Sequence, residues 1–63
     1  MTIEQVIEVV EDHTGQKVTA ASDLKDLGMD SLDFLELMVR LNIPDASVAN
    51  INTVKDLSDH FSG

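Results

Sequence analysis

The sequence predicts a small all-α protein in which three main helices, with one short helix before the last, form a single domain over residues 1–63. Three observations support this fold class. Apolar residues recur at helical spacing in three segments, residues that cap helices stand before those segments, and no segment alternates as a strand does. A chain of 63 residues has room for one domain with a thin stability margin.

The first helix is predicted from about Ile3 to about His13. Thr2 and Gln5 form a capping-box pattern at its start. The apolar residues at helical spacing are Ile3, Val6, Ile7 and Val10. Gly15 can end this helix because glycine tolerates the left-handed backbone conformation.

Residues 16–30 lack clear periodicity and predict a long connection, held to the core by isolated apolar residues. These anchors are Val18, Leu24, Leu27 and Met29. A connection of this length in a small domain is usually functional or contains short structure of its own.

The second helix is predicted to begin at Asp30 or Ser31, since both side chains can cap a helix. Pro44 restricts the residue before it, so the helix should end near Leu41 or Asn42. The buried stripe expected on this helix consists of Leu32, Leu35, Met38 and Val39, broadened by Phe34, Leu37 and Leu41.

The short helix is expected to begin with Asp45 as its cap and to run to about Val48 or Ala49. Thr53 and Asp56 then form a second capping-box pattern, with an acid at the fourth position. The inward face expected for the last helix consists of Val54, Leu57 and Phe61.

The formal net charge of −8 excludes a nucleic-acid-binding role, because phosphate binding needs clustered basic residues and only four are present, scattered along the chain. We expect partners that present basic patches instead. No apolar run is long enough to span a bilayer, and residues 1–4 lack the basic start of a signal peptide. The sequence therefore predicts a cytoplasmic monomer without membrane insertion.

No metal site is predicted. If Gly28 took the turn position of a calcium-binding loop, Lys25 and Leu27 would fall where acidic ligands are needed. With no cysteine, and with His13 and His60 far apart in the sequence, a transition-metal site is also not expected.

Ser31 is the residue with the most informative surroundings, and its position alone allows three interpretations. It can be a helix cap, a covalent attachment point, or a nucleophile. A phosphodiester at this position would meet free backbone N–H groups and the positive end of the helix dipole. A nucleophile requires a base within reach, which the two distant histidines do not suggest, so no catalytic residue is predicted.

Residues 27–32 read Leu-Gly-Met-Asp-Ser-Leu and resemble the Leu-Gly-x-Asp-Ser-Leu signature of acyl carrier proteins. Further similarity to this family lies in residues 33–37, 43–45 and 51–54. The resemblance implies that a separate phosphopantetheinyl transferase attaches 4'-phosphopantetheine to Ser31. The thiol of this arm would hold acyl groups as thioesters for enzymes of fatty acid or polyketide type.

The resemblance also implies a recognition surface at Asp30, Leu32, Asp33 and Glu36, where acyl-transferring or synthase enzymes with basic patches would bind. The alternative for the acids is a solvated helix face, on which Glu36 pairs with Arg40 at helical spacing. Two rival functions stay open at this point. One is a carrier of aminoacyl or peptidyl groups, and the other is an acidic interaction module that is never modified.

The chain is shorter than typical acyl carriers between the Asp-Ser-Leu and Ile-Pro-Asp blocks, by roughly one to two helical turns. A shorter second helix should enclose a shallower cavity. We therefore expect long acyl chains to be poorly sequestered among the helices.

Overall fold

A computed structural model describes residues 1–62 of the chain. The elements in order are α1 (Ile3–Thr14), a 3-10 helix (Leu24–Leu27), α2 (Ser31–Arg40), α3 (Asp45–Val48) and α4 (Val54–Ser62). Within the described residues there is no strand, and a single isolated backbone bridge joins Asp23 to Thr53. The predicted all-α fold, with three main helices and a short helix before the last, is confirmed.

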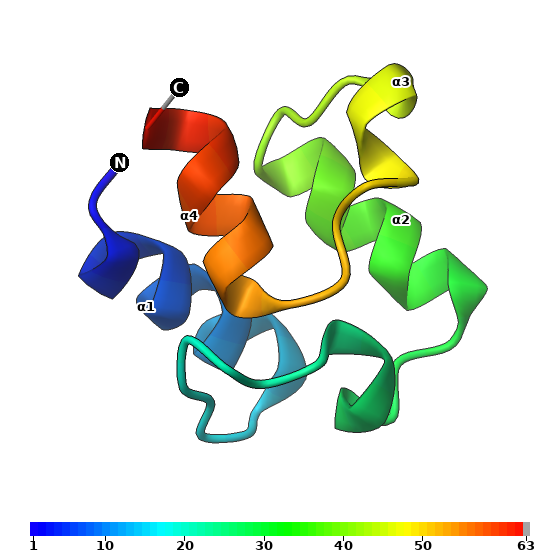
Figure 1. The fold of residues 1–63 in the computed structure, drawn as a ribbon. Helices are drawn as coiled ribbons and strands as arrows, with labels where there is room; N and C mark the ends of the chain where they lie inside the picture. Colours follow the sequence, from blue (N-terminus) through cyan, green and yellow to red (C-terminus); the bar gives the residue numbers. More distant parts are fainter. Residues whose placement is uncertain (63) are drawn as a thin grey trace.

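Helices α1 and α4 lie side by side, and the start of α1 and the end of α4 lie at the same side of the bundle (Figure 1). Helix α2 lies on the other side of α4, and the short α3 sits near the C-terminal end of α2 (Figure 1). No helix among residues 1–62 is long and apolar enough to cross a membrane.

The predicted caps of α1 are present. The Thr2 hydroxyl accepts a hydrogen bond from the backbone N–H of Gln5 at 3.2 Å, and the Gln5 side chain accepts one from the Thr2 N–H at 2.8 Å. Gly15 ends the helix in the left-handed conformation with φ 70°, and its N–H donates to the carbonyl of Glu11. These contacts pair backbone groups that a helix end would otherwise leave unsatisfied.

The second predicted capping box opens α4. The Asp56 N–H donates to the Thr53 hydroxyl at 3.1 Å, while the Asp56 carboxylate accepts from the N–H groups of Thr53 at 3.0 Å and Asn52 at 2.9 Å. These backbone donors, Asn52 first, hold the pKa of Asp56 below its ordinary value of 3.8. The carboxylate thus favours the folded state whenever it is ionised.

The cap at Asp56 predicts a specific loss of stability in acid. Because its pKa is lower in the folded than in the unfolded chain, its contribution is present above about pH 3.8 and is lost as the pH falls through the folded value. We expect Asp56→Asn to lower the urea midpoint at neutral pH. In strong acid, where the wild-type carboxylate is also uncharged, the urea midpoints of the variant and the wild type should be more similar. Asp59→Asn, which removes an exposed partner of Lys55, is the control. Equal pH profiles for wild type and Asp56→Asn would contradict this role.

Among residues 1–62, twelve buried hydrophobic residues form the core, and they come from every helix except α3 and from the connections. They are Val6, Val10, Val18, Leu24, Leu27, Leu37, Met38, Leu41, Ile43, Ile51, Val54 and Leu57. Three of the four predicted anchors of the long connection are buried, and the fourth, Met29, packs against the core while half-buried.

The buried stripe predicted for α2 is wrong at three of its four principal positions. Leu32, Leu35 and Val39 are 63%, 50% and 78% exposed, and only Met38 of that stripe is buried. The inward face consists instead of Phe34, Leu37, Met38 and Leu41. Both sets recur at helical spacing, so α2 is apolar on two faces and only its packing against the other helices decides which face is inward.

The ends of α2 and α3 differ less from expectation. Helix α2 ends at Arg40, and Asn42 adopts a left-handed φ of 59°, so the chain leaves the helix before Pro44 as predicted. Asp45 was expected to cap the short helix, but it is the first helical residue, and Pro44 occupies the cap position without a side-chain hydrogen bond.

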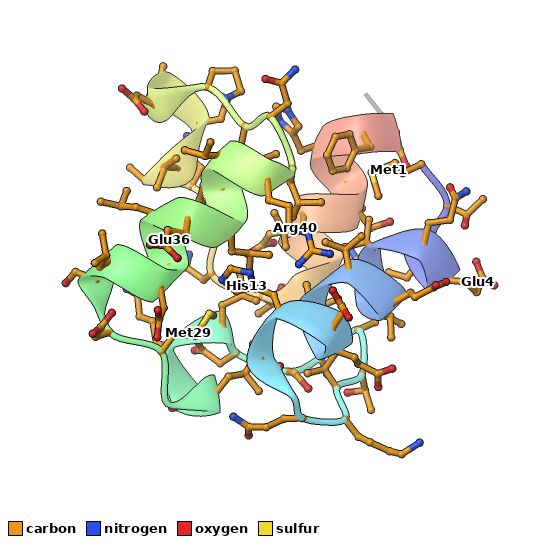
Figure 2. The ribbon with its side chains drawn as sticks, turned by 180° about the vertical axis from the view of Figure 1, so that it is seen from behind. Met1, Glu4, His13, Met29, Glu36 and Arg40 are labelled. Carbon is orange, nitrogen blue, oxygen red and sulfur yellow. The ribbon has the colours of Figure 1, made fainter. Side chains whose placement is uncertain are left out.

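Two contacts join the C-terminal half of α1 to α2. The Arg40 guanidinium pairs with the Asp12 carboxylate at 2.6 Å, and His13 Nε2 lies 3.0 Å from the backbone carbonyl oxygen of Asp33. Figure 2 shows Arg40 and His13 between these two helices. The alternative pairing of Arg40 with Glu36 is therefore not adopted, because Arg40 reaches across to α1.

Candidate functional site

The segment that leads into α2 is anchored at the start of the 3-10 helix. The Leu24 N–H donates to the Asn52 carbonyl at 2.8 Å, and the Lys25 N–H donates to the Asp23 carboxylate at 2.9 Å. Gly28 then ends the 3-10 helix with a left-handed φ of 76°, a conformation that favours glycine. A Cβ at Gly28 would meet no atom within 4 Å, so the backbone angle rather than crowding explains the glycine.

Ser31 is the first residue of α2 and is exposed. Asp30 is the cap of this helix: its carboxylate accepts a hydrogen bond from the Asp33 N–H at 2.8 Å. Within residues 1–62 the Ser31 hydroxyl has no hydrogen-bond partner. The structure thus decides between the two candidate caps in favour of Asp30 and leaves the Ser31 hydroxyl available for chemistry.

Within the described part of the chain, neither histidine forms a hydrogen bond with Ser31. His13 is engaged with the Asp33 carbonyl, and His60 is on α4, where its ring meets Phe61 edge to face. Nor do residues 1–62 contain three His, Cys, Asp or Glu side chains close enough together to hold a metal ion. What the site offers is an exposed serine whose hydroxyl forms no hydrogen bond within residues 1–62.

An open groove of about 400 Å³ begins at Ser31. Its walls come from the 3-10 helix, the loop and α2, and the lining residues are Leu24, Lys25, Met29, Asp30, Ser31, Phe34 and Leu35. Most of these side chains are apolar, and Lys25 is the only base among them. Figure 1 shows the 3-10 helix, in the chain segment around residue 25, next to the start of α2.

The residues predicted for partner recognition share the exposed surface of α2 and its cap. Asp30, Leu32, Asp33 and Glu36 are all exposed, and Figure 2 shows Glu36 directed outward from α2. Neither Asp33 nor Glu36 forms an ion pair within residues 1–62. Sequence reasoning missed two neighbours on this surface, Leu35 and Val39, because it assigned them to the core.

These features fit a phosphodiester-linked arm on Ser31. The hydroxyl is exposed and unengaged, and it stands at the N-terminal end of a ten-residue helix, where the dipole favours an anion. A largely apolar groove lies directly beside it. The N-terminal end of the helix suits an anionic linkage, and the groove suits the partly apolar chain that would follow it.

Comparison with known proteins agrees with this fit. Residues 2–61 match the family model described as "Phosphopantetheine attachment site". The chain is also 43% identical to an acyl carrier protein from Zymomonas mobilis subsp. mobilis, in an alignment that covers 87% of this chain and 83% of that protein. Fold, site and both matches agree: the chain belongs to the acyl carrier protein family, whose members hold covalently attached 4'-phosphopantetheine.

Proposed function

We propose that Ser31 is the attachment point of 4'-phosphopantetheine and that the chain carries acyl groups as thioesters on the thiol of this arm. The observation that supports the proposal is that two neighbouring residues differ in their contacts. Asp30 caps α2, while the exposed Ser31 hydroxyl forms no hydrogen bond within residues 1–62. The chain contains no cysteine, so the reactive sulfur would arrive with the arm.

In this proposal the chain presents cargo and other proteins catalyse the reactions. A phosphopantetheinyl transferase would load Ser31, and acyl-transferring or synthase enzymes of fatty acid or polyketide type would act on the cargo. A cytoplasmic location and a monomeric state remain predictions from the sequence. The expected poor sequestration of long acyl chains also remains a prediction, and the open form of the groove beside Ser31 is in keeping with it.

We further propose that these enzymes bind the exposed surface of α2 and its cap. Its acids, Asp30, Asp33 and Glu36, would face basic patches, since an overall charge of −8 also steers the chain toward cationic surfaces. Leu32 lies among these acids with 63% of its surface exposed and supplies an apolar contact. A ring of charge around an apolar contact is the arrangement found in many protein interfaces.

Incubation of the unmodified protein with coenzyme A and a promiscuous phosphopantetheinyl transferase tests the attachment. We expect the intact mass to increase by one phosphopantetheine, and fragment masses to place the group on Ser31 rather than on Ser22, Ser47, Ser58 or Ser62. An unchanged mass, or an adduct on another serine, would contradict the proposal.

A further inference from the structure

We propose that Lys25 binds the phosphodiester of the arm and directs the arm into the groove between the 3-10 helix and α2. This inference rests on the proposed attachment to Ser31 and assigns Lys25 as a positioning residue for the bound group. The position of Lys25 on the 3-10 helix, beside the attachment residue, suggests it.

Charge complementarity is the first argument. A phosphodiester on Ser31 adds a negative charge to a segment that already contains Asp30 and Asp33. Lys25 is the one basic residue that lines the groove at Ser31. Asp23 and Asp26 belong to the same segment but do not line the groove, so attraction to Lys25 draws the phosphodiester toward the groove-facing side of the 3-10 helix.

The other basic residues are engaged or lie elsewhere. Arg40 of α2 pairs with Asp12 of α1, and Lys55 pairs with Asp59 within α4. Lys17 lies in the connection that follows α1 and does not line the groove. Within residues 1–62, Lys25 forms no ion pair, so its ammonium group can meet the phosphodiester without breaking an existing contact.

The backbone of Lys25 is held in place, which limits the region that its ammonium group can reach. Its N–H donates to Asp23, and the preceding residue, Leu24, is fully buried and bonded to the carbonyl of Asn52. Beyond the phosphodiester, the arm carries a carbon with two geminal methyl groups. Met29, Phe34 and Leu35 line the same groove and provide an apolar surface for these methyls.

Nuclear Overhauser measurements on the modified protein test this placement. We expect cross-peaks between the geminal methyls of the arm and the side-chain methyls of Met29 and Leu35. Lys25→Glu should abolish these cross-peaks and shift the phosphorus resonance, because the charge reversal repels the phosphodiester. Lys17→Glu makes the same change of charge outside the groove and should leave both signals as in wild type. High salt should weaken the wild-type cross-peaks, since the ion pair is exposed to solvent.

The controls separate this inference from the proposed attachment. Lys25 is exposed and forms no ion pair within residues 1–62, so amide spectra of the unmodified variant should match those of wild type away from residue 25. A wild-type protein that gains no mass overturns both proposals. A protein modified on Ser31 whose cross-peaks are absent, or are equal in Lys25→Glu, overturns the role of Lys25 and leaves the attachment intact.

Discussion

Replacing Ser31 with alanine will abolish the addition of phosphopantetheine, so the variant will keep its unmodified mass under conditions that convert the wild type completely. The removed hydroxyl is the proposed acceptor, and the other four serines lie outside the segment that matches the carrier signature. Ser47→Ala removes a hydroxyl within α3 and is the matched control, which should be modified like the wild type. Intact mass after reaction with coenzyme A and transferase is the measurement.

The Ser31→Ala variant should remain folded, because the residue is exposed and Asp30 continues to cap α2. Its circular dichroism and unfolding midpoint should therefore match those of the wild type. Modification of Ser31→Ala would show that another residue accepts the arm. Full biological activity of the unmodifiable variant would instead favour an acidic interaction module that works without the arm.

Replacing Leu57 with alanine will remove a large share of the stability of the domain. Leu57 is fully buried in α4 within the shared core. A buried leucine truncated to alanine costs about 2–5 kcal/mol, and a domain of this size has little more than that available. We expect a large fall in the urea midpoint, with a substantial unfolded population already present without denaturant.

Leu32→Ala is the matched control for Leu57→Ala, since it makes the same chemical change on the exposed face of α2, where 63% of the side chain is in contact with solvent. Its unfolding free energy should stay within about 0.5 kcal/mol of the wild type, as is usual for surface substitutions. Similar midpoints for the two variants would mean that the packing of α4 described above is not the one adopted in solution.

The helix boundaries could be predicted because they depend on local contacts. Thr2 with Gln5, and Thr53 with Asp56, are reciprocal caps whose partners lie three residues apart, so the sequence contains the whole interaction. The start of α2 was ambiguous because Asp30 and Ser31 are both good caps. Only the structure shows that the Asp30 carboxylate accepts a hydrogen bond from the Asp33 N–H.

The inward face of α2 could not be predicted from periodicity. Leu32, Leu35 and Val39 recur at helical spacing just as well as Leu37 and its neighbours do. Which set is buried depends on how α2 packs against helices distant in the sequence. One feature of the sequence indicated that some apolar residues of α2 would be exposed: the helix contains more of them than a single buried face requires.

The candidate site also has one part that the sequence indicates and another part that only the fold brings together. Ser31 and the acids around it could be proposed as the site from the sequence because they form one continuous motif. The groove and the proposed role of Lys25 were not predicted, because they depend on the position of the 3-10 helix beside α2. In the sequence, Lys25 is simply one of four scattered bases.

The cap at Asp30 has a consequence for the working cycle of the carrier. Since the Ser31 hydroxyl holds no part of α2 in place, turning it into an ester removes no hydrogen bond from the helix. The attached arm would then add its favourable interaction with the positive end of the helix dipole without removing a hydrogen bond, so by linkage the folded helix would favour attachment. Each enzyme in a sequence of reactions would meet the same folded α2, and only the tethered cargo would distinguish one stage from the next.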